Sequence, residues 1–438
     1  MTKPIVAIVG RQNVGKSTLL NRLAGKRIAI VSDVPGTTRD RIVTSVFWKE
    51  REFVVVDTGG LETGGGSDIA HEVNQQVKTA IDGADAIIFL VDVRDGITAS
   101  DSEIADILRS SAKPLLLAAN KADNNRLEAE VVEFFSLGLG EPLPISAYHG
   151  RGIFELVDKI VSLLPEAPVV EAGGEQIRIA IVGRPNVGKS MLLNALLGEP
   201  RVIVSDVPGT TRDAIDTQLD FEGQSVLLID TAGIKRRGRV GKGIAQYSVL
   251  RSLRAIDRAD VVLLVLDATE LVVAQDVHIA GYIQQAARGI ALVVNKWDLV
   301  VNSNKTECSK YVRNKLKFVP YAPVLYTSAK LGQGTDKVIP RAQQIYRERL
   351  KRIPTTKVNS VIQRAAATHI PPRSGKKQLK MLYATQADVN PPTFVFFVND
   401  SELVHFSYRR YLENRLRQSF GFDGTPLRLI FKNRSEQC

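Results

Sequence analysis

The sequence G-R-Q-N-V-G-K-S at residues 10–17 decides the fold, because the chain repeats its pattern as G-R-P-N-V-G-K-S at residues 183–190. Each copy follows an apolar, β-type run, at 5–9 and 177–182, and leads into a helix-type segment. A strand, a glycine-rich loop and a helix in this order predict a phosphate-binding loop, whose backbone N–H groups point at an anion. The helix N-terminus adds partial positive charge. A chance glycine-rich turn is disfavoured by two copies in matching context.

The two loops predict a complete set of phosphate and metal contacts. We expect Lys16 and Lys189 to neutralise β- and γ-phosphate oxygens, and the hydroxyls of Ser17 and Ser190 to bind Mg²⁺. The nucleotide-binding residues assigned to the loops are Gly10, Arg11, Gln12, Asn13, Val14, Gly15, Lys16 and Ser17, with Gly183, Arg184, Pro185, Asn186, Val187, Gly188, Lys189 and Ser190.

A second duplicated stretch, S-D-V-P-G-T-T-R-D, lies at residues 32–40 and 205–213. Proline and glycine disfavour regular structure there, so the stretch predicts a mobile loop. A threonine in such a loop completes the Mg²⁺ shell only when the γ-phosphate is present, which makes the loop a sensor of nucleotide state. We assign this role, as Mg²⁺ ligands, to Thr38 and Thr211.

Two buried-type strands, at 53–56 and 226–229, end in D-T-G-G-L and D-T-A-G-I. The aspartate is expected to act on Mg²⁺, and the last glycine to read the γ-phosphate with its N–H. A lone D-x-x-G is a weak signal, but its place after both phosphate loops makes it specific. The residues assigned to the nucleotide site here are Asp57, Thr58, Gly59, Gly60 and Leu61, with Asp230, Thr231, Ala232, Gly233 and Ile234.

The sequences N-K-A-D at 120–123 and N-K-W-D at 295–298 predict the base that is bound. A carboxylate accepts hydrogen bonds from N1–H and the exocyclic amine of guanine, whereas adenine offers it an acceptor nitrogen. A site built on such bonds rejects the wrong base strongly. A solvated turn explains one copy but not the ordered pair. The guanine-site residues are Asn120, Lys121, Ala122, Asp123, Ser146 and Ala147, with Asn295, Lys296, Trp297, Asp298, Ser328 and Ala329.

The order of motifs on alternating strand and helix patterns predicts an α/β chain. We expect two tandem P-loop GTPase domains with doubly wound, mostly parallel sheets: the first module at 3–167 and the second module at 177–352. An acidic, flexible linker at 168–176 joins them. The C-terminal module, 353–438, reads as a small α+β domain compatible with a KH-like, RNA-binding fold. The letters of the KH clamp, G-x-x-G, occur at 421–424, but before the last strand, so we do not assign them that role.

The net charge of +11 is unevenly distributed along the chain. Residues 1–176 hold 18 Lys+Arg against 25 Asp+Glu, residues 177–350 hold 25 against 16, and residues 351–438 hold 15 against 6. The basic parts predict a polyanionic partner, most often nucleic acid, with solubility charge as the alternative. A cationic loop at 235–242 is a candidate RNA contact that changes with nucleotide state, unless it is simply a solvated loop.

The composition indicates a cytoplasmic protein. Hydrophobic content is 44%, and no apolar run has the roughly 18 residues of a membrane helix. Met1-Thr2-Lys3-Pro4 leads directly into the first strand, so we expect no signal peptide. The two cysteines, Cys308 and Cys438, have no disulfide or metal spacing.

Both modules resemble translation-factor-type GTPases, and the whole chain resembles the Der (EngA) family of bacterial GTPases, including P-P-T-F-V at 391–395 and L-V-H-F-S-Y at 403–408. The resemblance implies GTP hydrolysis in the cytoplasm and a role in assembly of the large ribosomal subunit. It implies binding to that subunit and its rRNA through the KH-like domain, by a protein that is monomeric off the ribosome and has no DNA or membrane partner. Met191 and the stretch 270–273 depart from the family pattern, with local effects only.

The catalytic residues assigned are Lys16, Thr38 and Gly60, with Lys189, Thr211 and Gly233. The water-orienting glutamine of many GTPases is replaced by Leu61 and Ile234. Asn13 and Asn186 resemble the asparagine that coordinates K⁺ in potassium-activated GTPases, where the cation does the electrostatic work of an arginine finger.

Two other functions stay open at this point. One is a nucleotide-responsive RNA-binding chaperone in which hydrolysis is only a reset. The other is a membrane-acting GTPase, which the missing amphipathic or lipidation segment disfavours.

Overall fold

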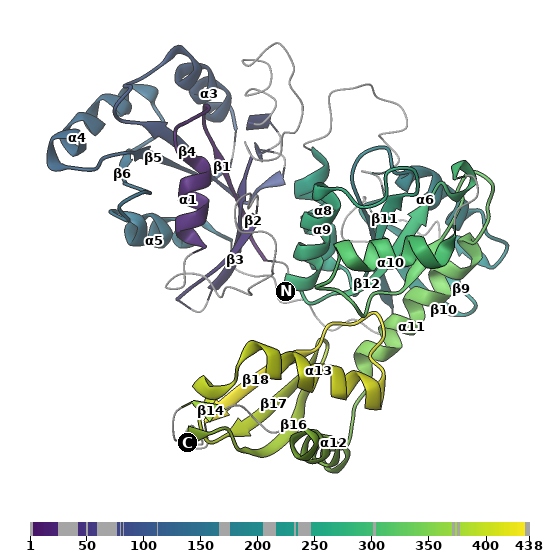
Figure 1. Ribbon diagram of the computed structural model, residues 1–438. Helices are drawn as coiled ribbons and strands as arrows, with labels where there is room; N and C mark the ends of the chain where they lie inside the picture. Colours follow the sequence, from purple (N-terminus) through teal and green to yellow (C-terminus); the bar gives the residue numbers. More distant parts are fainter. Residues whose placement is uncertain are drawn as a thin grey trace. The chain divides into compact units, whose positions relative to one another are not determined.

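The computed structural model (Figure 1) describes residues 3–24, 43–49, 51–58, 77–78, 80–81, 83–111, 113–165, 176–204, 216–231, 234, 247–300, 304–369, 373–374 and 377–433. The chain forms two compact units, Met1–Gly173 with Gly241–Asp257, and Gly174–Val240 with Arg258–Cys438. The predicted linker lies outside the described residues except for Gln176.

The first module is built on a six-stranded sheet in the order β2-β3-β1-β4-β5-β6. The strands are β1 (Ile5–Val9), β2 (Val43–Trp48), β3 (Arg51–Asp57), β4 (Ala86–Asp92), β5 (Leu115–Asn120) and β6 (Leu143–Pro144). The helices are α1 (Lys16–Leu23), α3 (Ala99–Arg109), α4 (Asn125–Glu130), the 3-10 helix η2 (Val131–Leu137) and α5 (Ile153–Leu163). Only β2 runs antiparallel to its neighbour. Strand β1 is buried along its whole length, as expected for a central parallel strand.

The second module repeats this plan in a seven-stranded sheet of order β13-β12-β11-β7-β10-β9-β8. The strands are β7 (Ile177–Val182), β8 (Val202–Val204), β9 (Thr217–Phe221), β10 (Gln224–Ile229), β11 (Val261–Asp267), β12 (Gly289–Asn295) and β13 (Val324–Tyr326). The helices are α6 (Lys189–Leu197), α9 (Ala274–Gln285), η4 (Trp297–Leu299), α10 (Lys305–Lys315), η5 (Thr335–Lys337) and α11 (Val338–Leu350). Helix α8 (Tyr247–Arg258) precedes β11 in the chain, and all of it except Arg258 belongs to the first compact unit. The predicted doubly wound, mostly parallel sheets are confirmed in both modules.

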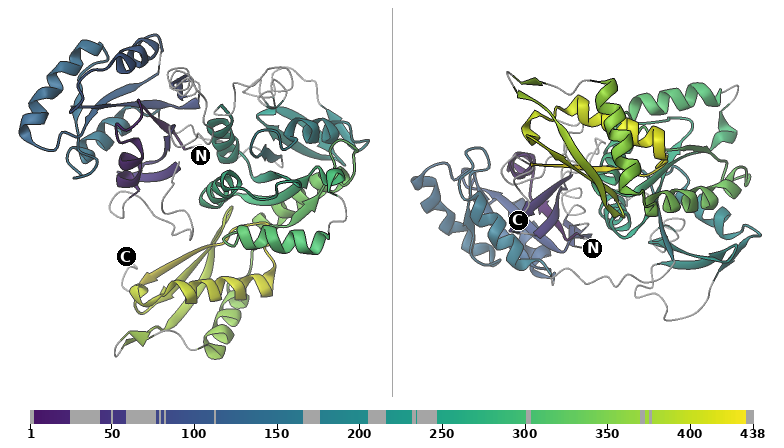
Figure 2. Two further views of the ribbon diagram at one scale, coloured as in Figure 1. Left: turned by 45° about the horizontal axis from the view of Figure 1, so that its top comes forward. Right: turned by 90° about the horizontal axis from the view of Figure 1, so that it is seen from below.

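The C-terminal module packs two helices on one face of a three-stranded sheet (Figure 2). Its elements are α12 (Thr355–Thr368), β14 (Arg373–Ser374), β15 (Lys377–Gln378), β16 (Met381–Val389), β17 (Pro392–Val398), η6 (Ser401–Leu403), α13 (Phe406–Phe420) and β18 (Arg428–Asn433). Strand β17 pairs antiparallel with β16 and parallel with β18. This α-β-β-α-β order agrees with the predicted α+β module.

The loop G-F-D-G at 421–424 docks the C-terminal module onto the second module. Gly424 donates its N–H to Tyr321 O at 2.9 Å and accepts from Ile290 N at 2.7 Å. A Cβ on Gly424 would lie 2.4 Å from Ile345 Cγ1, so only glycine fits this close approach. The loop therefore has a packing role in the chain, consistent with its not being assigned as a KH clamp.

Candidate nucleotide-binding sites

The two phosphate loops have the same backbone conformation. The φ angles are 151° at Gly10 and 147° at Gly183, 64° at Asn13 and 65° at Asn186, and 99° at Gly15 and 94° at Gly188. Glycine, and to a lesser degree asparagine, tolerates this left-handed region. The repeated sequence thus folds into a repeated anion-binding loop, and helices α1 and α6 begin at the lysine that follows it.

Each loop lysine spans its own loop. Lys16 Nζ donates to Gly10 O and Arg11 O, both at 2.7 Å, and Lys189 Nζ donates to Gly183 O at 2.7 Å and Arg184 O at 2.5 Å. The ammonium group is therefore tied to the carbonyls of the first two residues of its own loop. Phosphate oxygens entering the loop would meet a cation that is already in place.

Two predicted Mg²⁺ ligands of the first module, Ser17 and Asp57, are hydrogen-bonded to each other, whereas the described bond of Ser190 in the second module goes to a carbonyl. Ser17 Oγ donates to Asp57 Oδ2 at 2.7 Å, and Asp57 is buried. Ser190 Oγ instead donates to Ile234 O at 2.8 Å, while Asp230 has a left-handed backbone with φ 57°. A hydroxyl beside a carboxylate is the hard-oxygen donor set that Mg²⁺ prefers, so the first site fits the ion as it stands.

Several predicted site residues lie outside the described part of the chain. They are Thr38, Gly59, Gly60, Leu61, Thr211, Ala232 and Gly233. The cationic loop 235–242 also lies outside the described residues. Two threonines next to these residues are described, and each forms a hydrogen bond to another strand. Thr58 Oγ1 donates to Ile8 O at 2.8 Å, and the hydroxyls of Thr231 and Thr217 lie 2.6 Å apart.

The motif asparagines brace the guanine site against the phosphate loop. Asn120 Nδ2 donates to Val14 O at 2.7 Å and Asn120 Oδ1 accepts from Ala147 N at 2.9 Å. Asn295 repeats both bonds, to Val187 O at 3.0 Å and from Ala329 N at 3.0 Å. The three predicted motifs of each site thus come together through one buried amide.

The base-reading aspartates are oriented by serine hydroxyls. Ser146 Oγ donates to Asp123 Oδ1 at 2.6 Å, and Ser328 Oγ donates to Asp298 Oδ1 at 2.5 Å. Burial raises the pKa of Asp123, but the bonds from Ser146 and Arg94 outweigh it and hold that pKa below its usual range. The carboxylate that would face guanine is therefore ionised at neutral pH. The sequence predicts that both serines belong to the guanine site, but it gives no sign that their hydroxyls orient the aspartates.

The sequence reasoning also missed two aspartates that hold the motif lysines. Lys121 forms an ion pair with Asp92, and Lys296 Nζ lies 2.6 Å from Asp267 Oδ2. Both aspartates end an apolar strand, β4 and β11, which is the signal that would have found them. Burial raises the pKa of Asp267, yet the bonds from Lys296 and Thr269 keep it below the usual value.

A second missed pair of acids anchors the arginine of each phosphate loop. Arg11 Nε lies 3.4 Å from Asp101 Oδ2, and Arg184 Nε lies 3.4 Å from Asp276 Oδ2. Both aspartates are fully buried near the start of a helix, α3 or α9. Burial raises the pKa of Asp276 to about 6, against the bonds from Val273 N and Arg184.

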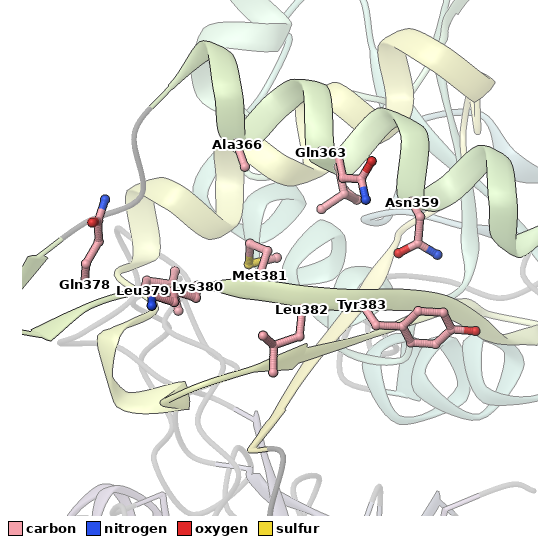
Figure 3. A pocket seen from close by; sticks show the side chains of 10 residues that line it. Asn359, Gln363, Ala366, Gln378, Leu379, Lys380, Met381, Leu382 and Tyr383 are labelled. Carbon is pink, nitrogen blue, oxygen red and sulfur yellow. The ribbon is translucent and has the colours of Figure 1, made fainter.

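A separate groove of about 460 Å³ lies between α12 and β16 of the C-terminal module (Figure 3). Lys380 is its one cation, and Leu382 and Tyr383 are exposed beside it. Its lining residues are Asn359, Ile362, Gln363, Ala366, Gln378, Leu379, Lys380, Met381, Leu382 and Tyr383. None of them belongs to a nucleotide motif, so the groove is not part of a GTP site.

Within the described residues, no helix combines the length and the apolar character needed to cross a bilayer.

Two family models match separate parts of the chain, and individual relatives match it over nearly its whole length. A model described as "50S ribosome-binding GTPase" matches residues 5–121 and 178–296, and one described as "KH-domain-like of EngA bacterial GTPase enzymes, C-terminal" matches residues 352–432. GTPase Der of Chloroflexus aggregans is 51% identical over 447 residues, covering 100% of this chain and 99% of its own. GTPase Der of Geobacillus thermodenitrificans is 50% identical over 436 residues, covering 99% and 100%.

Among solved structures, Aquifex aeolicus Era bound to GDP.AlF4- is 26% identical, covering 58% of this chain and 87% of its own, with a TM-score of 0.30. The family assignment follows from the full-length relatives and from the two duplicated sites. The chain is a GTPase, and it belongs to the Der (EngA) family.

Proposed function

We propose that this GTPase acts as a nucleotide-controlled switch in assembly of the large ribosomal subunit, binding rRNA through its basic second and C-terminal modules. The observation that carries the proposal is the joining of two guanine-nucleotide sites to basic modules in one chain. One family model that matches the chain is described as a ribosome-binding GTPase, and the other as a KH-like domain. We place the protein in the cytoplasm as a monomer off the ribosome, without DNA or membrane partners, and keep the module boundaries at 3–167, 177–352 and 353–438.

The residues of each site have separate roles in this proposal. Lys16 and Lys189 bind and orient the β- and γ-phosphates, while Asp123 and Asp298 select guanine. Ser17 with Asp57, and Ser190 with Asp230, would hold Mg²⁺, which supplies charge neutralisation on the phosphates when bound. Thr38 and Thr211 would complete that shell, and Gly60 and Gly233 would read the γ-phosphate.

K⁺ is the proposed activating cation, because Leu61 and Ile234 cannot orient water. Asn13 and Asn186 fit this role, since both are exposed at the tip of a loop that holds them at the same φ. Hydrolysis is compared in KCl and NaCl at equal ionic strength, for the wild type and for Asn13→Ala with Asn186→Ala. The expected result is faster turnover in KCl that the double variant loses. Equal rates in both salts would remove the two asparagines from the mechanism.

The function itself is tested with purified large ribosomal subunits. We expect co-sedimentation with the subunit to depend on whether GDP or a GTP analogue is bound, and the subunit to raise multiple-turnover hydrolysis. Small subunits are the control. Nucleotide-dependent binding without stimulated turnover would favour the RNA-chaperone function, in which hydrolysis only resets the protein. No binding to large subunits in any state would refute the proposed role.

A further inference from the structure

Helix α10 of the second module carries a dense group of cations that GTP binding does not use. Residues 304–317 contain one acid, Glu307, and five basic residues, all exposed: Lys305, Lys310, Arg313, Lys315 and Lys317. Among the described residues, no ion pair joins any of the five to an acid. Lys305 and Lys315 lie over the rings of Tyr326 and Tyr311, but no described acid neutralises any of the five charges.

The helix holds these cations on a rigid base. Cys308 and Val312 are buried, Asn304 Oδ1 caps the helix by accepting from Thr306 N at 2.9 Å, and Tyr326 Oη donates to Lys305 O at 2.7 Å. One shallow hollow of about 410 Å³ is lined by Lys305, Thr306, Ser309, Lys310 and Arg313. We call the five residues that line this hollow the α10 face. At roughly 1.5 Å of rise per residue, the cations of the α10 face span about 12 Å of helix.

The first module provides an internal comparison for this charge. Its equivalent segment, 124–137, also follows the guanine motif and also begins with an asparagine cap, Asn124 Oδ1 accepting from Leu127 N at 3.0 Å. That segment has a single basic residue, Arg126, against Glu128, Glu130 and Glu133. A helical segment with an asparagine cap thus occurs at both places with opposite charge, as α4 followed by η2 in the first module and as the continuous helix α10 in the second. The fold does not require a basic helix here, so the charge is a separate property of the second module.

The cations continue beyond α10 onto the C-terminal module, which belongs to the same compact unit. Arg410 of α13 is exposed, and its Nη2 donates to Lys317 O at 3.3 Å. Lysine, arginine, serine and threonine side chains are the usual donors to nucleic-acid phosphates, and the α10 face contains all four.

We propose that the α10 face binds the phosphate backbone of RNA and extends the RNA-binding surface from the C-terminal module onto the second module. The proposal rests on the proposed function, because it names which residues of the second module meet the RNA. Contacts to phosphate carry no sequence information, so this face contributes affinity and orientation.

The test is the triple variant Lys305→Gln, Lys310→Gln, Arg313→Gln in the full chain. Binding to a fluorescein-labelled RNA hairpin and to purified large subunits is measured between about 50 and 200 mM KCl. Loss of three phosphate contacts should lower the log–log salt slope by about two to three and weaken binding on the order of tenfold or more, equally for hairpins of different sequence. Basal GTP hydrolysis and GDP affinity should stay unchanged.

The matched control removes the same number of positive charges, three, from the first module by the substitutions Lys78→Gln, Arg126→Gln and Lys159→Gln. A salt slope close to the wild type is expected for it. Wild-type affinity and salt slope in the triple variant, or a salt slope that falls equally in both variants, would overturn the role of the α10 face and leave the proposed function standing. A wild-type chain that binds neither probe would instead refute the proposed function, and the inference with it.

Discussion

At the scale of single residues, each GTP site depends on one glycine that faces a buried amide. A Cβ on Gly188 would lie 2.3 Å from Asn295 Nδ2, and its φ of 94° disfavours any other residue. We expect Gly188→Ala to break the bond from Asn295 to Val187 and to weaken GDP binding at the second site by about tenfold or more, the equivalent of roughly 1.4 kcal/mol. Titration calorimetry should then show that the number of tightly bound nucleotides per chain falls from two toward one.

Gly281 is the control for that variant, because among the described residues outside its own stretch of helix a Cβ there would meet no atom within 4 Å. Gly281→Ala should leave both sites intact and stabilise α9 by roughly 0.5–1 kcal/mol. Unchanged GDP binding in Gly188→Ala would show that the asparagine brace does not support the site.

Asp276 gives the second module a defined pH dependence. Burial raises its pKa to about 6, above the roughly 3.9 of an unfolded chain. Between these values the native state keeps a proton that the unfolded state has released, so this group makes stability fall as pH rises. Asp276→Asn removes that contribution. The difference in Tm, variant minus wild type, should therefore rise from about pH 4 to about pH 6 and then level off. A difference that is flat across this range would contradict the raised pKa.

At the scale of elements, α11 links the second module to the C-terminal module through a buried cation. Arg349 donates to Ala287 O at 2.9 Å, Thr425 Oγ1 at 3.3 Å and Asn390 Oδ1 at 2.6 Å. Burial lowers its pKa to about 10, which leaves it charged at neutral pH. The helix therefore needs partners from both modules to satisfy one side chain.

We expect Arg349→Ala to destabilise this unit by about 3 kcal/mol, because three acceptors lose their donor and a cavity forms. Scanning calorimetry should show the corresponding transition lowered by roughly 6–12 °C. Arg347→Ala, on the exposed face of the same helix, is the control and should change stability by no more than about 0.5 kcal/mol. Equal effects of the two substitutions would contradict the linking role.

At the scale of the whole molecule, the charge changes sign between the first module and the rest of the chain. Residues 1–176 are acidic, with 18 Lys+Arg against 25 Asp+Glu, and the remainder is basic. Attraction between surfaces of opposite charge acts within a Debye length of about 8 Å at physiological salt.

We predict that the first module competes with RNA for the basic surface and that the nucleotide bound to the first module decides which of the two occupies it. A chain starting at Gln176 should then bind large subunits more tightly than the full chain, with less dependence on nucleotide. Identical affinity and nucleotide dependence for both chains would show that the modules act independently.

The sequence by itself determined the features that depend on neighbouring residues. Strand, loop and helix patterns predicted two mostly parallel α/β modules, the order of motifs predicted guanine nucleotide, and the glycine-rich repeats predicted the two phosphate loops. The C-terminal module was also predicted as a small α+β domain, because its apolar periods are local. Such features are readable since each is set by a short stretch of chain.

Only the tertiary structure decided the contacts between distant segments. Asn120 and Val14 are 106 residues apart, and no local pattern pairs them. The two sites share every motif, yet Ser17 meets Asp57 whereas Ser190 meets Ile234, because each hydroxyl bonds to whatever the surrounding chain brings near. Likewise, the sequence alone predicts that Arg349 is an ordinary surface cation. It is buried because α11 lies where two modules close over it, and burial is a property of the packed fold rather than of the residue.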